Sequence, residues 1–252
     1  MRGWLDECGH RHAECHIHTT AQAPTRLLDI GSETENREPR LILAGQRELT
    51  YAILSYCWGT LPISDSSKTT KGNAVEHLNQ IARDSLPRTI QDAIRVIRAL
   101  GLQYIWVDSF CIIQDDPTDW SYEASKMMQY YEHAFVTIVA TSAESVHNGF
   151  LHNRTQHLIS KSMPYLWKEG PNQPLYLCEP RYKNSSDSVD EALWNQRAWT
   201  LQERLLSRRL LHFTGTAVWF ECRTGFRSDG WLSDRIDSLK ARWLPEVRGE
   251  LE

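Results

Sequence analysis

Tyr104-Ile-Trp-Val-Asp108 is the short stretch on which the fold depends. Its aromatic and β-branched side chains form an apolar run, which is typical of a strand buried on both faces. A helix is predicted on either side of it, over about residues 89–100 and 119–133, and Gly101 can end the first of these helices. The stretch therefore predicts the middle of an alternating arrangement of strands and helices.

Two further apolar stretches extend this arrangement in both directions. Tyr51-Ala-Ile-Leu-Ser-Tyr56 precedes the first helix, and Phe135-Val-Thr-Ile-Val-Ala140 follows the second. Strands that alternate with helices in this way indicate a parallel sheet covered by helices. A third helix near 198–206 leads into strands at 209–213 and 217–222, which a tight turn joins. The sequence predicts an α/β fold: a mainly parallel sheet with flanking helices, irregular insertions and a C-terminal hairpin.

Composition excludes several classes of protein. The chain has 252 residues, 41% of them hydrophobic and 24% charged, which is typical of a globular protein. Its formal net charge of -4 gives no basic field for nucleic acid, and no apolar run approaches the roughly 20 residues of a membrane span. Six scattered cysteines and an N-terminus that turns polar early favour the cytoplasm over a secreted, disulfide-bonded protein.

Three blocks of sequence, in this order, carry a family resemblance. They are Tyr51-Ala-Ile-Leu-Ser-Tyr-Cys-Trp-Gly59, the segment from Leu86 through Gln114 to Trp120, and Arg197-Ala-Trp-Thr-Leu-Gln-Glu-Arg-Leu205 with its follow-on at 219–222. Together they resemble the heterokaryon incompatibility (HET) domain family. The resemblance implies a role in fungal nonself recognition, in which an activated domain triggers programmed cell death. The expected organisation is an N-terminal extension of helix plus loop at 1–44, a HET domain at 45–225, and a tail at 226–252 that looks like the start of a region cut off.

A more distant resemblance concerns the third block. Trp199-Thr-Leu-Gln-Glu203-Arg-Leu205 is similar to the Trp-Cys-x-x-Glu-Leu helix of Toll/interleukin-1 receptor (TIR) domains, and Ser55-Tyr56 is similar to the end of that family's first strand. The order of elements is TIR/flavodoxin-like. In the NAD-cleaving TIR domains the matching glutamate is catalytic, which implies a catalytic Glu203, NAD as substrate and no cofactor. Such domains often complete their site by self-association.

The chemistry of NAD cleavage fits a single carboxylate. Nicotinamide leaves as a neutral molecule and needs no acid, so one carboxylate near the ribose can stabilise the developing oxocarbenium charge. Glu203 is the candidate. The alternative is that Glu203 only pairs with Arg197, Arg204 or Arg208 at the surface.

Polar and aromatic residues at the ends of the predicted strands are the candidates for substrate binding, because ligands of open parallel sheets lie beyond the carboxyl ends of the strands. Trp58 could stack on a base or nicotinamide ring, Gly59 would let the backbone approach a ligand, and Asp108 could hold a ribose diol. Alternatively, Trp58 fills the core and Asp108 caps a turn; for Trp106 the core interpretation is preferred. The full set is Ser55, Tyr56, Trp58, Gly59, Asp108, Ser109, Gln114, Arg197 and Trp199.

The pattern Cys8-x3-His12-x2-Cys15-x2-His18 contains residue types that bind zinc. Its spacing matches no standard zinc finger, and Cys8, His12 and Cys15 also share one face of the predicted helix. We therefore predict no metal site. Cys57 and Cys111 are weak candidates for a nucleophile, because neither has a neighbouring histidine in the sequence.

Two functions follow as hypotheses. In the first, the chain is an NAD glycohydrolase that depends on Glu203. In the second, the same surfaces form a non-catalytic oligomerisation module that recruits a downstream death effector. Both include self-association and a protein partner in incompatibility signalling, and neither includes nucleic acid.

Overall fold

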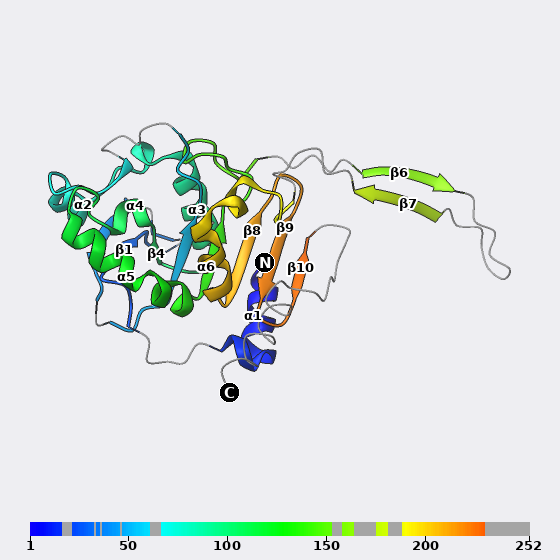
Figure 1. The fold of residues 1–252 in the computed structure, drawn as a ribbon, viewed down its shortest axis with the longest axis horizontal. Coiled ribbons are helices and arrows are strands. Elements are labelled where there is room, and N and C mark those ends of the chain that lie inside the picture. The colour runs from blue at the N-terminus through cyan, green and yellow to red at the C-terminus, as the bar shows by residue number, and fades with distance from the viewer. Residues whose placement is uncertain are drawn as a thin grey trace.

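The computed structural model describes residues 1–16, 22–60 without 33, 36 and 46, 67–152 and 188–229, together with the backbone of two strands at 158–163 and 175–180. Those two strands, β6 (Leu158–Met163) and β7 (Leu175–Pro180), form a separate antiparallel pair that projects from the body of the molecule (Figure 1).

A single eight-stranded sheet forms the centre of the fold, in the order β10-β9-β8-β5-β3-β4-β1-β2. Its four middle strands run parallel, and antiparallel strands complete both edges. The mainly parallel α/β sheet predicted from the apolar stretches is confirmed. The strands are β1 (Arg26–Asp29), β2 (Arg40–Leu43), β3 (Tyr51–Ser55), β4 (Tyr104–Trp106), β5 (Val136–Val139), β8 (Arg209–Phe213), β9 (Val218–Cys222) and β10 (Phe226–Ser228).

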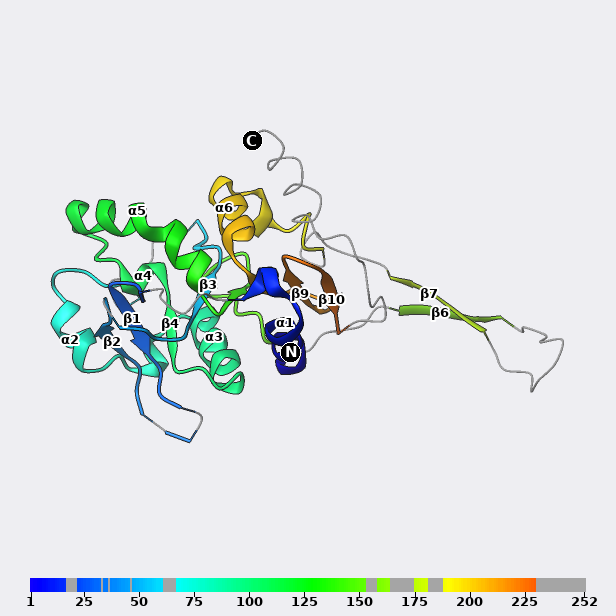
Figure 2. The same cartoon turned by 90° about the horizontal axis from the view of Figure 1, so that it is seen from below.

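Helices cover both faces of this sheet. Helix α3 lies on one face, and α5 and α6 lie side by side on the other (Figure 2). Right-handed crossovers require this division, because the chain moves one way from β3 to β4 and the other way from β4 through β5 to β8. The α-helices are α1 (Arg2–Arg11), α2 (Ala74–Asn79), α3 (Arg88–Ala99), α4 (Asp108–Cys111), α5 (Pro117–His133) and α6 (Ala198–Leu206), with 3-10 turns η1 (Ala13–Cys15), η3 (Arg83–Ser85) and η5 (Leu193–Gln196).

Local signals explain where the two long helices begin and end. Asp116 accepts hydrogen bonds from the backbone N–H groups of Thr118 and Asp119, and Pro117 is the first residue of α5. At the other boundary, Gly101 has a φ of 81° just after α3, a left-handed conformation that favours glycine. These signals are local, so both helices match their predicted ranges to within two residues.

The N-terminal 44 residues and the segment after 225 differ from expectation. Strands β1 and β2, in the predicted extension, and β10, in the predicted tail, belong to the central sheet. Helix α1 ends at Arg11, and the short turn η1 follows it at Ala13–Cys15. Strand β1 has a charged residue at each end, and its buried Arg26 donates to the carboxylate of Asp119 at 2.6 Å and to the Cys111 carbonyl at 2.7 Å. Such short strands depend on pairing within the sheet, which no local pattern reveals.

The four parallel strands follow one another along the chain as β3, β4, β5 and β8. Across the sheet they lie in the order β4-β3-β5-β8, so the second strand comes first, followed by the first, third and fourth. This is the strand order of flavodoxin-like folds, whose switch point lies between the first and third strands. Ligands of such sheets bind at the carboxyl ends of the strands near that point. Here these ends are the loop after Ser55 and the loop after Val139.

Candidate functional site

The loops that follow β3 and β4 are joined by side-chain hydrogen bonds. Trp58 Nε1 donates to Asp108 Oδ2 at 2.9 Å, and the Tyr56 hydroxyl donates to Ser109 Oγ at the same distance. The backbone N–H of Ser109 donates to the other oxygen of Asp108 at 2.7 Å. Four of the predicted site residues therefore meet at one edge of the sheet, as expected for neighbouring parallel strands.

Glu203 reaches the same edge from α6. Its side chain is buried, and its carboxylate accepts a hydrogen bond from the hydroxyl of Ser55, the last residue of β3. Trp194 Nε1 donates to the same Ser55 oxygen at 2.6 Å, and the Tyr131 hydroxyl of α5 acts on the carboxylate to lower its pKa. The carboxylate is therefore held between α6, α5 and the end of β3 rather than in bulk solvent.

The alternative prediction is that Glu203 pairs with Arg197, Arg204 or Arg208 at the surface. It is wrong for Arg204 and Arg208. Arg204 donates to Glu221 at 2.8 Å, and the guanidinium of Arg208 donates to backbone carbonyls, including that of Glu132. Arg197 is the exception, because its charge acts on both Glu203 and Asp108 while its guanidinium donates to the Tyr56 carbonyl at 2.6 Å. The site thus combines two carboxyl groups with one half-buried guanidinium.

Burial sets the electrostatics of this site. It raises the pKa of Glu203, and the Ser55 hydrogen bond and the Arg197 charge offset only part of that rise. Burial likewise raises the pKa of Asp108, against the lowering effect of the Trp58 hydrogen bond. The Asp108 charge also raises the pKa of Glu203. Carboxyl groups displaced from their ordinary pKa in this way are common at functional sites.

Several predicted site residues hold the loops in place. Tyr56 and Ser109 are buried and bonded to each other, and the Gln114 amide donates to the carbonyls of Asp108 and Ile112 at 3.0 and 3.1 Å. Trp199 lies on the outer face of α6 with 64% of its side chain exposed, away from the buried cluster. Trp58 is half-buried, in contrast to the buried Tyr56 and Ser109.

The surroundings of Cys57, Cys111 and Trp106 decide between the roles considered for each of them. Burial raises the pKa of Cys57, and raises that of Cys111 to about 12, so both remain thiols at neutral pH and neither is an activated nucleophile. Trp106 is fully buried against the rings of Tyr130 and Tyr131, which confirms the core interpretation.

Trp194 and Tyr131 complete the site and were not predicted from the sequence. Trp194 lies just before the third block, and Tyr131 lies within the helix predicted over about residues 119–133. Behind Trp194, Arg204 and His212 both donate to the fully buried carboxylate of Glu221 at 2.8 and 3.1 Å. The nearest sequence signal was the third block itself, which includes Arg204 and whose follow-on includes Glu221.

Gly59 adopts a backbone conformation that favours glycine. Its φ is 90°, and a Cβ at this position would lie 2.6 Å from the Cβ of Ser145. Gly59→Ala is therefore expected to destabilise the protein by about 1–3 kcal/mol in urea denaturation. Gly225→Ala is the matched control, because a Cβ there meets open space. Equal stability of the two variants would contradict this interpretation.

Together, the fold and the site define an α/β protein with a buried carboxylate at the carboxyl end of a parallel sheet. The family model described as heterokaryon incompatibility protein (HET) matches residues 51–203, which is more than half of the chain. The chain therefore belongs to the HET family. No curated protein and no solved structure matches it. Within the described residues, no helix combines the length and apolarity needed to cross a membrane.

Proposed function

We propose that this HET domain hydrolyses NAD at the bond between nicotinamide and ribose, and that this activity acts in the cytoplasm during fungal nonself recognition and programmed cell death. The observation that supports the proposal is the placement of Glu203: a buried carboxylate, held by Ser55, at the carboxyl end of the first parallel strand. This is where a nucleotide binds in folds with this strand order.

The chemistry assigns a role to each charged group. Nicotinamide departs with the bonding electron pair and becomes neutral, while positive charge develops on the ribose. The Glu203 carboxylate stabilises that charge and then takes a proton from the water that adds to the ribose carbon. Arg197 supplies positive charge for the diphosphate, Trp58 contacts a base, and Ser55 holds the carboxylate in place.

The test is nicotinamide release from NAD by the purified chain, followed by chromatography over a range of protein concentrations. The wild type is expected to release nicotinamide, more rapidly per molecule as concentration rises if self-association completes the site. Glu203→Gln is expected to lose the activity, and Glu191→Gln, which removes an exposed carboxylate nearby, is expected to keep it. No release by the wild type at any concentration would overturn the proposal.

A second function, a non-catalytic oligomerisation module that recruits a death effector, is favoured by the outer face of α6. Trp199 and Leu201 are 64% and 63% exposed there, whereas Thr200 and Glu203 of the same helix face inward. Large exposed apolar side chains are typical of interaction surfaces. The same helix thus directs Glu203 into the buried site and exposes two large apolar side chains to solvent.

Self-association through this face has its own test. The double variant Trp199→Ser, Leu201→Ser is expected to weaken association at least about tenfold in analytical ultracentrifugation, because tryptophan is a frequent hot spot of interfaces. Leu43→Ser, at an equally exposed leucine on the far edge strand β2, is the control and is expected to have no effect. Equal association constants for wild type and the double variant would exclude α6 as the interface.

A further inference from the structure

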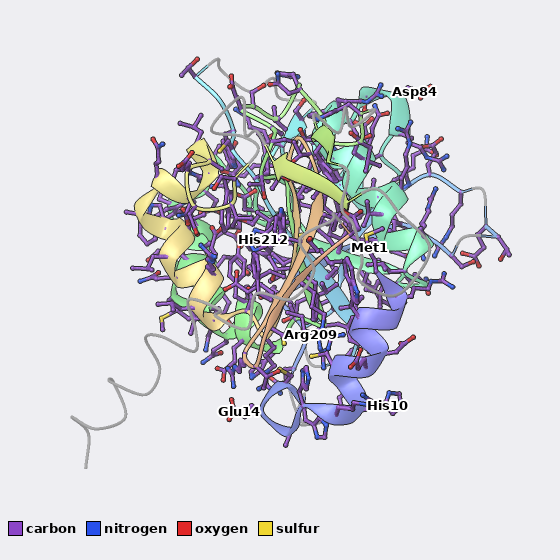
Figure 3. All side chains as sticks on the ribbon, turned by 90° about the vertical axis from the view of Figure 1, so that its right-hand side faces the viewer. Met1, His10, Glu14, Asp84, Arg209 and His212 are labelled. Carbon is purple, nitrogen blue, oxygen red and sulfur yellow. The ribbon has the colours of Figure 1, made fainter. Side chains whose placement is uncertain are left out.

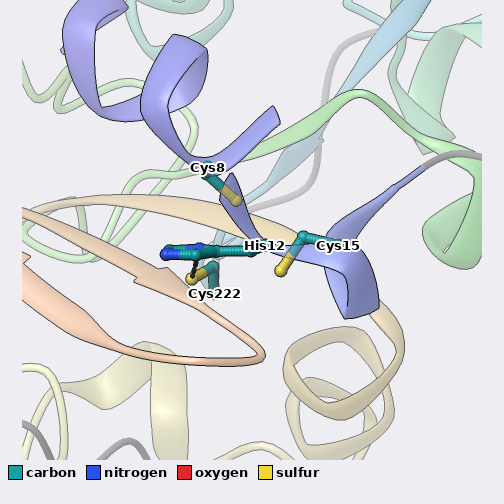
Figure 4. A group of neighbouring side chains, drawn as sticks. All are labelled: Cys8, His12, Cys15 and Cys222. Carbon is teal, nitrogen blue, oxygen red and sulfur yellow. Dashed lines mark hydrogen bonds between the residues drawn. The ribbon is translucent and has the colours of Figure 1, made fainter. Parts of the chain in front are cut away.

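Four side chains with metal-binding atoms converge where the N-terminal segment meets the sheet. They are Cys8 from α1, His12 and Cys15 from the following turn, and Cys222 from the end of β9. Their ligand atoms all lie within 4.8 Å of one another. Figure 4 shows the four side chains gathered at one place. The three cysteines are buried and His12 is half-buried.

We propose that these four residues bind one zinc ion as a structural site of three thiolates and one imidazole. In tetrahedral zinc sites with zinc–sulfur bonds of about 2.3 Å and zinc–nitrogen bonds of about 2.0 Å, neighbouring ligand atoms lie about 3.5–3.8 Å apart. The Sγ of Cys222 and the Nδ1 of His12 are separated by 3.5 Å. Four protein ligands leave no position open for a substrate, so the site stabilises the fold rather than catalyses a reaction.

The charge around the cluster fits a metal–thiolate centre. Zn²⁺ with three thiolates and a neutral imidazole carries one net negative charge. Arg209 is only 3% exposed, and its Nε donates to the sulfur of Cys8 at 3.3 Å. Its other hydrogen bonds go to the carbonyls of Phe135 and Cys15, and none goes to a carboxylate in the part of the chain that the structure describes. A buried guanidinium needs a counter-charge, which the zinc–thiolate centre supplies and neutral thiols do not.

The site also explains how the N-terminal segment is held on the sheet. Figure 3 shows Arg209 beside the N-terminal helix, at the boundary between that segment and the sheet. In α1 and η1 the buried residues are Leu5, Cys8 and Cys15, so two of the three are cluster thiols. A zinc ion would cross-link this small contact to β9.

The proposed ligand set departs from the prediction of no metal site, which is made because the N-terminal pattern has no standard zinc-finger spacing. The structure joins Cys8, His12 and Cys15 to Cys222, which lies far away in the sequence. His18, the fourth residue of the sequence pattern, lies outside the described residues. A zinc site built across such a distance has no spacing signature.

The first test is the metal content of the full chain, purified without chelators and measured by plasma mass spectrometry. About one zinc per chain is expected for the wild type and for Cys111→Ala, which removes a buried cysteine outside the cluster. Cys8→Ala and Cys222→Ala are expected to lose most of it. Zinc retained in both of these variants would overturn the proposal. So would a metal-free wild type whose intact mass is lower by two hydrogens, which indicates a disulfide among these cysteines.

A second measurement does not depend on whether the alanine variants fold. Cobalt exchanged into the wild type is expected to give the visible and thiolate charge-transfer absorption of a tetrahedral site with three thiolates. Cys222→His keeps a fourth ligand, so it is expected to retain the metal with a weaker charge-transfer band. Absence of these bands in the wild type would exclude the site.

Discussion

Glu203→Gln is expected to slow nicotinamide release by about 10²- to 10³-fold, the usual effect of removing one group that stabilises transition-state charge. The substitution keeps the size of the side chain and an oxygen that can accept from Ser55. It removes only the negative charge. The measurement is kcat for wild type and variant at one protein concentration, so that self-association is the same in both.

The same substitution is expected to increase stability at neutral pH. Because burial raises the pKa of Glu203 in the folded protein, the unfolded chain ionises first as pH rises. The stabilising contribution of the protonated group is full below the ordinary glutamate pKa and is lost as pH rises through the raised, folded-state pKa. Glutamine does not titrate, so the variant avoids this loss.

Urea denaturation of the wild type and Glu203→Gln at several pH values tests whether the substitution increases stability. The free energy of unfolding of Glu203→Gln should exceed that of the wild type increasingly from the ordinary glutamate pKa upward. Asp108 also has a raised pKa but is present in both proteins, so its titration largely cancels in the comparison. A variant with lower stability at neutral pH would show that Glu203 is mainly a structural partner of Ser55.

Glu221→Ala is expected to destabilise the protein by about 3–5 kcal/mol, the largest stability effect that the structure predicts. The Glu221 side chain is fully buried and accepts from Arg204 at 2.8 Å and from His212 at 3.1 Å. Among the described residues, its removal leaves the buried Arg204 with the exposed Asp190 as its one ion-pair partner. His212 also loses Glu221 as a carboxylate partner, and its ring packs against Trp194. The hydrogen bond from Trp194 to Ser55 is therefore also expected to weaken.

Glu132→Ala is the matched control. Its carboxylate lies 3.9 Å from Arg208 and is 42% exposed, so its loss is expected to change stability by less than about 1 kcal/mol. Urea denaturation curves of the two variants give the comparison directly. Similar losses in both would mean that burial of the Glu221 network contributes little.

Much of the fold is predictable because its signals are local. An apolar run of four to six residues, a proline before a helix and a glycine after one act on their immediate neighbours, so the parallel strands and long helices lie close to their expected ranges. The edge strands β2 and β10, and β1 beside β2, carry no such signal. They form because their backbone groups hydrogen-bond to neighbouring strands. Arg26 has the sequence character of a surface residue, and it is buried because it pairs with carboxylates that lie far away in the sequence.

The sequence by itself determined the family, the parallel core and one catalytic candidate, Glu203, because each of these is carried by residues that are adjacent or one helical turn apart. Only the tertiary structure decided which groups surround that carboxylate and which cysteine joins the N-terminal thiols. Ser55 meets Glu203, and Cys8 meets Cys222, across most of the chain. Such contacts arise from the packing of strands and helices in three dimensions, and no spacing along the sequence encodes them.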